Sequence, residues 1–263
     1  MALRKRTKNR IYHLGTYAVL AAILIWAVLS TDWPKVAHQF ANPEVAAKMF
    51  PGIITIALKN TILFTLVAFF GGLVLGIVLA LMKLSEVGPF RWVSTAWIEL
   101  FRGLPALMTI FAFAYMLPIA LDVRIPGGSV GAGLLGLVCV ASAYMAETIR
   151  AGIQAVPKGQ TEASRSLGMS PMKTMFWVVL PQGFRIIIPP MTNEFVLLLK
   201  DTSLMFMAGT TLLTKELTTF ARDGLTQNAS ATPFVMAALL YLVVTIPLTR
   251  FVAWLERRMA KER

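Results

Sequence analysis

The sequence predicts an all-α integral membrane protein, a helical bundle with six membrane spans. The chain of 263 residues is 57% hydrophobic and only 14% charged, whereas a soluble domain is expected to be about 25% charged. Apolar runs of about 20 residues recur along it, which is the length that crosses a bilayer core. Lys and Arg gather in alternate loops between these runs, as they do in multi-pass membrane proteins.

The basic residues also predict the orientation of the spans. The expected spans are residues 13–30, 54–82, 104–121, 130–147, 184–207 and 233–253. One set of alternating segments holds 18 Lys and Arg residues, and the other set holds five. Because Lys and Arg favour the cytoplasmic side, we expect both termini and the loop between the fourth and fifth spans in the cytoplasm. The net charge of +12 arises in these loops, so we expect contact with membrane lipid and no nucleic-acid partner.

Residues 1–53 are expected to form a basic N-terminus, a first span and an outer segment. Five basic residues precede an apolar run from about Gly15 to Leu29, which is also the pattern of a secretory signal peptide. No small-x-small cleavage site follows in Ser30–Pro34, however, and Trp33 is typical of an anchor at the membrane interface. We therefore expect the first span to be retained.

The second span contains three closely spaced glycines, Gly71, Gly72 and Gly76. Small residues at such spacing let two helix backbones approach closely, and we interpret these as packing within the chain rather than as a dimer face. A further helix is expected over 90–101 in the next loop. Arg102–Pro105 should end that helix where the third span begins.

Residues 125–133, IPGGSVGAG, form a glycine-rich segment between the third and fourth spans. A phosphate-binding loop requires Gly-Lys-Ser/Thr at the Walker spacing, and no such lysine follows here, so we expect a turn. No Walker A motif occurs elsewhere in the sequence. We expect this chain to bind no cofactor of its own and to contain neither catalytic residues nor a metal site.

The polar segment 148–183 separates the fourth and fifth spans and predicts two short helices. Pro157 can open the first helix, because its missing N–H would be unpaired there anyway. Gly168 should end it, since glycine readily adopts the left-handed conformation of a helix C-terminus. Ser170–Pro171 then provides an N-cap and a first helical residue for the second helix, and Leu180–Pro181 is expected to end that helix.

The same segment carries a spaced motif. Glu162-Ala163-Ser164 is followed after three residues by Gly168 and, after nine more, by Val178-Val179-Leu180-Pro181. This order resembles the EAA loop of ABC importer permeases, which reads Glu-Ala-Ala, three residues, Gly, nine residues, Ile, any residue, Leu-Pro. Ser164 stands where that pattern has Ala, and Val178 stands where it has Ile.

Further motifs flank this loop and resemble the polar amino-acid uptake branch of the binding-protein-dependent type I importers. They are Glu99–Pro105, Glu147–Ile153, Pro157–Gln160, Leu180–Gln182 and Leu198–Leu204. The resemblance covers roughly residues 55–255. It implies a permease domain over 54–255 with a five-helix core, preceded by one additional N-terminal span and followed by a cytoplasmic tail over 256–263.

The resemblance also implies the partners and the cellular location. Segment 148–183 would couple the chain to a separate ATPase, which would bind the ATP and Mg. The residues assigned to this coupling are Pro157, Gly159, Glu162, Ala163, Ser164 and Gly168. A second permease subunit, identical or paralogous, would complete the pathway, together with a dimer of ATP-binding subunits and an extracellular or periplasmic substrate-binding protein. The expected location is the prokaryotic inner (plasma) membrane.

The fifth expected span is unusual because it carries polar and ionisable residues after Pro189–Pro190, which is expected to interrupt it. Ionisable side chains at membrane depth cost about 2.5–3.5 kcal/mol each on insertion scales, so they usually face the bundle interior and serve a function. Candidates for the substrate pathway are polar residues of this span and one residue of the third: Asn193, Glu194, Lys200, Asp201 and Thr109.

A spacing of seven residues places Glu194 and Asp201 on one helix face and Asn193 and Lys200 on the adjacent face. A substrate with an α-ammonium and an α-carboxylate group could use groups of both signs. The alternative is that Lys200 and Asp201 lie near the outer interface and only cap or pair within the bundle. The outer stretch Thr214–Asp223 is expected to form a short amphipathic helix, which either lies at the interface or helps to dock the binding protein.

Together these features predict a permease subunit of an ATP-driven importer for polar amino acids, such as glutamate, glutamine or a basic amino acid. The chain would form the translocation pathway and would not itself be an enzyme. The alternative is a self-contained ion-coupled carrier or channel. A carrier is expected to show internal repeats and broken helices in both halves, and we find one interrupted span and no convincing repeat.

Overall fold

The computed structural model describes residues 2–260, with side chains placed for residues 9, 10 and 12–259. This part of the chain consists of helices and turns without strands, which confirms the predicted all-α class. The last three residues of the expected tail over 256–263 lie outside the described residues, as do the side chains of the first four basic residues of the N-terminus.

The helices follow one another with short connections. The first half contains α1 (Ala2–Ser30), α2 (Trp33–Phe40), α3 (Pro43–Met49), η1 (Ile53–Leu58), α4 (Lys59–Leu84), α5 (Gly88–Gly103), α6 (Ala106–Phe111), η2 (Ala112–Met116) and α7 (Leu117–Leu121). The second half contains α8 (Gly128–Gln154), α9 (Lys158–Ser166), α10 (Pro171–Thr174), η3 (Met175–Val179), α11 (Leu180–Asp201), η4 (Thr202–Ala208), α12 (Leu217–Asn228) and α13 (Thr232–Ala260).

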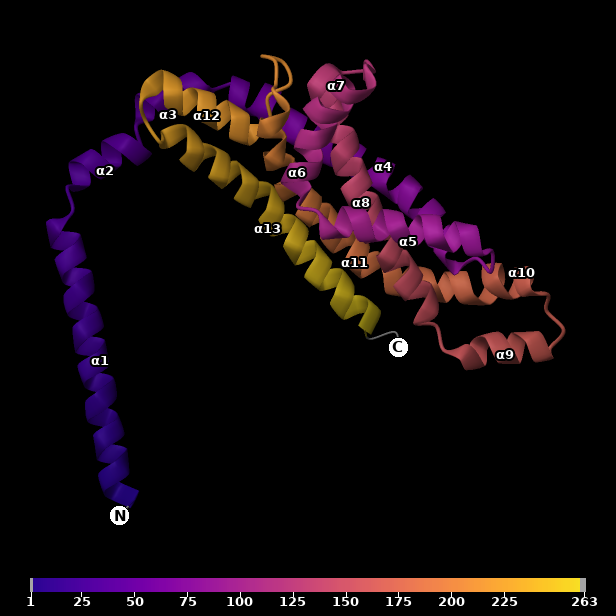
Figure 1. Ribbon diagram of the computed structural model, residues 1–263. Coiled ribbons are helices and arrows are strands. Elements are labelled where there is room, and N and C mark those ends of the chain that lie inside the picture. Colours follow the sequence, from indigo (N-terminus) through magenta and orange to yellow (C-terminus); the bar gives the residue numbers. More distant parts are fainter. Residues whose placement is uncertain (1, 261–263) are drawn as a thin grey trace.

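α1 stands apart from the other helices (Figure 1), and none of its apolar stretch Tyr12–Ser30 is buried in the protein. The chain turns after α1 at Asp32, whose carboxylate caps α2 by accepting a hydrogen bond from the Lys35 backbone N–H at 3.1 Å. The end of α2 is fastened to the bundle, because the Gln39 carbonyl accepts a hydrogen bond from the Ala231 N–H at 2.9 Å. The outer segment therefore consists of two short helices, α2 and α3.

α4 and α8 form the centre of the bundle and touch through small residues. A Cβ atom at Gly72 would lie only 2.6 Å from the Cβ of Ala141, and one at Gly76 would lie 3.0 Å from the Cβ of Met145. Both positions therefore require glycine for the two backbones to approach. This contact confirms that the glycines of the second span serve packing within the chain.

The third predicted span begins at a sharp bend. α5 meets the run α6–η2–α7 at an angle of 106° across Leu104–Pro105. Pro105 cannot continue a helix from α5, because it has no backbone N–H and restricts the residue before it. The helix predicted over 90–101 is present as the middle of α5, and its inner face buries Ser94, Ile98 and Phe101.

The fifth predicted span consists of α11 followed by the 3-10 helix η4, and its structure corrects two expectations. Leu180–Pro181 does not end the second helix of the polar segment, since α10 continues through the wide π-helical turn η3 into α11. Pro181 is tolerated because it directly follows the wide turn η3, where the regular helical hydrogen bonding is already changed. Pro189–Pro190 lies inside α11 without interrupting it, because a packed bundle can accommodate the missing N–H groups.

Among the described residues, four helices are long and apolar enough to cross a membrane: α1, η1–α4, α8 and α13. The bent pair of α5 with α6–α7 adds a fifth. α11 is not among them, and it carries four charged residues, Arg185, Glu194, Lys200 and Asp201. The total of six spans and the cytoplasmic placement of both termini therefore stay predictions.

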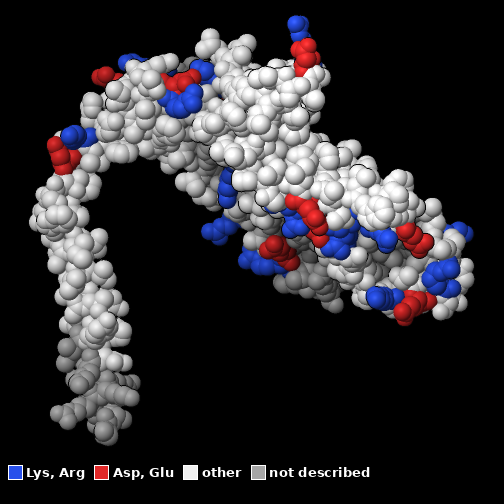
Figure 2. Space-filling view, viewed as in Figure 1, with Lys and Arg blue, Asp and Glu red and all other residues white. Residues whose placement is uncertain are grey.

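The two ends of the bundle carry most of the charge. In Figure 1, α9 and the C-terminal end of α13 lie toward one end of the bundle, and α3, α7 and α12 lie toward the other. Figure 2 shows Lys, Arg, Asp and Glu gathered near both ends, with a mostly uncharged surface between them. A protein that places its apolar middle in a bilayer is expected to distribute its charges in this way.

Candidate coupling segment and translocation path

The segment between α8 and α11 forms the hairpin that its residues predict. Pro157 takes the N-cap position of α9, with φ −56° and ψ 131°, so it opens the helix from the residue just before it. Ser170 caps α10 by accepting a hydrogen bond from the Lys173 N–H at 3.3 Å, and Pro171 follows in the first turn. Both of these helix starts were readable from local sequence.

Gly168 reverses the chain at the end of α9 with φ +82°, the left-handed conformation that its position predicts. The Met169 N–H donates to the Ser164 carbonyl at 3.1 Å, and the Gly168 N–H donates to the Arg165 carbonyl at 3.0 Å. This pair of bonds is the Schellman motif, which satisfies the last carbonyls of the helix. A Cβ atom at Gly168 would meet nothing within 4 Å, so the backbone conformation, rather than crowding within the chain, requires the glycine.

Ser164 joins the two limbs of the hairpin. Its hydroxyl donates to the Thr161 carbonyl at 2.9 Å and lies 3.3 Å from the hydroxyl of Thr174 in α10. Both side chains are buried. The serine that departs from the EAA pattern therefore provides a polar contact between α9 and α10, and Thr174 is a member of this segment that the sequence reading missed.

The remaining coupling candidates lie on the outside of α9. Glu162, Ala163 and Gly159 are exposed. The carboxylate of Glu162 makes no hydrogen bond or ion pair with the rest of the described chain, and a Cβ atom at Gly159 would meet nothing within 4 Å. No contact with the described residues explains a glycine or a glutamate at these two positions, so their surroundings are open to another molecule.

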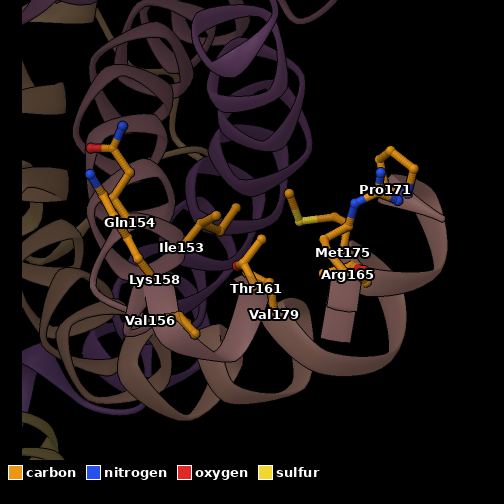
Figure 3. Close-up of a pocket in the computed structure, with 10 residues that line it drawn as sticks. Ile153, Gln154, Val156, Lys158, Thr161, Arg165, Pro171, Met175 and Val179 are labelled. Atoms are coloured by element: carbon orange, nitrogen blue, oxygen red, sulfur yellow. The ribbon is translucent and has the colours of Figure 1, made fainter. Parts of the chain in front are cut away.

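A hollow of about 630 Å³ lies between α9, the end of α8 and the start of the long helix that follows (Figure 3). Its floor is apolar and includes Ile153, Val156 and Val179. Its polar lining includes Lys158 and Arg165, and no acidic side chain lines it. The Arg165 guanidinium also donates to the Met169 carbonyl at 2.5 Å, which ties this side chain to the turn.

The second limb of the hairpin exposes large apolar side chains around Lys173. The exposed fractions are 68% for Met172, 58% for Phe176 and 77% for Trp177. Leu167, at the turn, is 84% exposed. The sequence predicts a polar segment here, and the structure shows that the outer surface of this limb is chiefly apolar.

α11 brings four of the substrate-pathway candidates together on two adjacent faces. Glu194 and Asp201 are half-buried, and Asn193 and Lys200 are exposed. The seven-residue spacing therefore separates the two acidic residues from the other pair, as predicted. α11 packs against α8, α13 and α4, so the acidic pair lies on the side of the helix nearer the bundle.

Thr109, the fifth candidate, lies in α6 and is almost fully buried. Its hydroxyl donates to the Pro105 carbonyl at 3.4 Å, within its own helix. Thr109 also lines an otherwise apolar hollow of about 600 Å³ with residues such as Phe101, Met108 and Phe113. The structure does not bring the Thr109 hydroxyl together with the charged residues of α11.

The outer helix begins later than predicted. Thr214 and Lys215 lie outside α12, which starts at Leu217 because Glu216 caps it. The Glu216 carboxylate is fully buried and accepts hydrogen bonds from the Thr218 and Thr219 N–H groups at 2.5 and 2.7 Å. Burial raises the pKa of Glu216 above its usual value even though these hydrogen bonds lower it.

The chain is similar to known transport proteins. Residues 72–261 match the family model described as binding-protein-dependent transport system inner membrane component. The chain is 38% identical over 205 residues to the probable glutamine ABC transporter permease protein GlnM of Bacillus subtilis, covering 77% of this chain and 91% of that protein. It is 34% identical over 218 residues to the L-cystine transport system permease protein TcyB of Bacillus subtilis, covering 82% and 90%. Among solved structures, it resembles one described as an amino acid ABC transporter with histidines, with a TM-score of 0.73, 34% identity and coverage of 81% and 96%.

Proposed function

Because the chain belongs to the family of binding-protein-dependent transport system inner membrane components, we propose that α9 couples it to a separate ATPase and that α11 lines the path of the transported amino acid. The chain is a permease subunit of an amino-acid ABC importer, which is a transport subunit rather than an enzyme. An ATPase and a substrate-binding protein are the partners that this family implies.

The coupling role rests on one observation: α9 is held rigidly by the turn at Gly168, and its outer face is exposed. The Schellman motif at Gly168 and the contact between Ser164 and Thr174 hold α9 against α10. Glu162, Ala163 and Gly159 lie on the exposed surface of this unit. A partner that moves α9 therefore moves the start of α11 with it, since α10 runs into α11 without a break.

The transported molecule is a polar amino acid. The exposed and half-buried groups of α11 supply both signs of charge and an amide, which suit an α-ammonium and an α-carboxylate group. Relatives of this chain are named for glutamine, L-cystine, arginine and glutamate/aspartate. Glutamate, glutamine and a basic amino acid are the substrates to examine first.

The working assembly contains two permease subunits, this chain paired with a second copy or with a paralogue. A dimer of ATP-binding subunits carries the ATP and Mg, and an extracellular or periplasmic binding protein delivers the amino acid. The assembly lies in the inner (plasma) membrane of a prokaryote, in contact with its lipids. The apolar middle of the bundle supports the membrane location.

Reconstitution tests this proposal directly. The chain is co-expressed with its ATP-binding subunit and placed in liposomes, and ATP hydrolysis and amino-acid uptake are measured with and without the binding protein. We expect hydrolysis that the loaded binding protein stimulates, and uptake that requires ATP. Uptake by this chain alone, driven by an ion gradient, would show instead that it is a self-contained carrier.

A further inference from the structure

One polar network joins the ends of α4 and α8 and involves none of the residues assigned so far. The Lys83 ammonium, in the last turn of α4, lies 3.2 Å from Glu147 Oε2 in α8. The Arg150 guanidinium also binds the Glu147 carboxylate, through Nε at 3.1 Å and through Nη2. Arg150 Nη1 then donates to Gln154 Oε1, on the last residue of α8.

This network is partly shielded from water. The exposed fractions of the three charged side chains are 24% for Lys83 and 23% each for Glu147 and Arg150. A surface ion pair contributes little on its own, but a hydrogen-bonded charge with two cationic partners is stronger and has a fixed geometry. Glu147 is the common acceptor, so its removal would leave two cations facing each other.

The packing of α4 on α8 does not depend on this network. The two helices already meet backbone to backbone at Gly72 and Gly76, closer to the middle of the bundle. The network lies beyond that contact, at the end of the bundle that carries α9. Its position therefore suits a role in holding the C-terminal end of α8, where the chain leads into α9, better than a role in assembling the α4–α8 pair.

The same stretch of α8 also fits closely against α11. A Cβ atom at Gly152 would overlap the side chain of Ile187, so α8 and α11 touch directly there. Gln154, the last member of the network, lines the hollow beneath α9 (Figure 3) together with Ile153. The stretch from Glu147 to Gln154 thus contacts α4 and α11 and borders the hollow beside α9, all within about two helical turns.

We propose that Glu147 is a positioning residue for energy coupling: it fixes the end of α8 to α4, so that displacement of α9 is transmitted to the bundle and not lost in fraying of α8. This inference rests on the proposed function of α9. It assigns a role to the flanking motif Glu147–Ile153, whose charged residues bind Lys83 and Gln154 rather than residues of α9 or α11.

The test uses the complete transporter in liposomes and the variant Glu147→Gln, which keeps the shape and removes the charge. We expect normal assembly and unchanged basal ATP hydrolysis, with only a small fall in the melting temperature, because Lys83 and Arg150 then lack the carboxylate between them. The amount of amino acid taken up per ATP should fall about tenfold, within the range of ordinary coupling free energies. Glu86→Gln is the matched control, because Glu86 is exposed and forms no ion pair within the described part of the chain.

A double-mutant cycle identifies the partner. Lys83→Met should lower the same ratio, and the double variant Lys83→Met/Glu147→Gln should be no worse than the poorer single variant, because both remove one contact. Full uptake per ATP in Glu147→Gln would overturn the inference. So would a loss of assembly, or a large loss of thermal stability, in Glu147→Gln together with normal coupling in Gln154→Ala, since that result would show a role in folding alone. If the unmodified transporter shows no stimulated hydrolysis, the proposed function fails before this inference is reached.

Discussion

Gly168 combines two properties that are usually separate. Its backbone has φ +82°, yet the space around its α-carbon is empty within the chain. A side chain at this position therefore acts first on the turn and second on whatever molecule faces it. Residues with a branched Cβ are strongly disfavoured in this conformation, whereas Asn tolerates it.

This difference gives a prediction with an internal control. Gly168→Val should redirect the turn, because the left-handed conformation costs about 1–2 kcal/mol for a residue with a Cβ atom and more for a branched one. ATP hydrolysis stimulated by the binding protein should fall strongly in liposomes, while membrane insertion stays normal. Gly168→Asn should retain most of the activity. Equal activity of the Val variant and the unmodified chain would remove the turn from the coupling mechanism.

Glu216 offers a prediction about pH. Burial raises its pKa in the folded protein above its value in the unfolded chain. Its protonated form therefore stabilises the fold, and this contribution is present at pH below the unfolded pKa and is lost as the pH rises through the folded pKa. Glu216→Gln imitates the protonated form, so its melting temperature relative to the unmodified protein should increase with pH over that interval. A difference that is constant with pH would contradict the assignment.

Among the helices, α9 to α11 show which features can be predicted from local sequence and which cannot. The cap at Ser170 and the turn at Gly168 were predictable because each depends on residues within one helical turn. Whether Pro181 ends a helix depends on the wide turn η3 and on neighbouring helices, and no local pattern discloses that. The contact of Ser164 with Thr174 spans ten residues and follows from the fold of the hairpin.

The charged face of α11 is tested with Glu194→Gln. We expect uptake to fall at least about tenfold at unchanged assembly, because the half-buried carboxylate would lose a charge-assisted contact with the transported amino acid, worth about 1.5–3 kcal/mol. Uptake is measured at several amino-acid concentrations, which separates weaker binding from slower transport. Glu256→Gln, at an exposed position of α13, is the control. Unchanged uptake of every amino acid tried would remove Glu194 from the path.

At the scale of the whole molecule, the sequence predicted the fold class, close helix packing within the chain at the glycines of α4, and the family resemblance. It did not disclose that α1 stands away from the bundle or that α5 lies across the helix that follows it. Both depend on how separate helices pack, and the hydropathy of each helix says nothing about that. Glu147 was visible only as part of a motif, because its partner Lys83 lies on another helix, although Arg150 is three residues further along α8.

The predicted orientation is tested by labelling single cysteines in whole cells. Cys139 is the one cysteine of the sequence and is buried, so Cys139→Ala provides a silent background. A membrane-impermeant maleimide should label Leu213→Cys from outside, since Leu213 is 77% exposed on the outer loop. It should label Gly159→Cys only after the cells are opened. Labelling of Gly159→Cys in intact cells would place the hairpin on the wrong side for an ATPase.

The close contact of α4 with α8 constrains how such a machine can move. Two backbones that interlock at Gly72 and Gly76 cannot slide past each other without a collision. The pair then moves as one rigid unit, and bending is expected where the helical winding is wider, in the π-helical segments η1, η2 and η3. A ligand or an antibody that stiffens one of these π-helical segments should therefore stop transport without contacting the ATP-binding subunits.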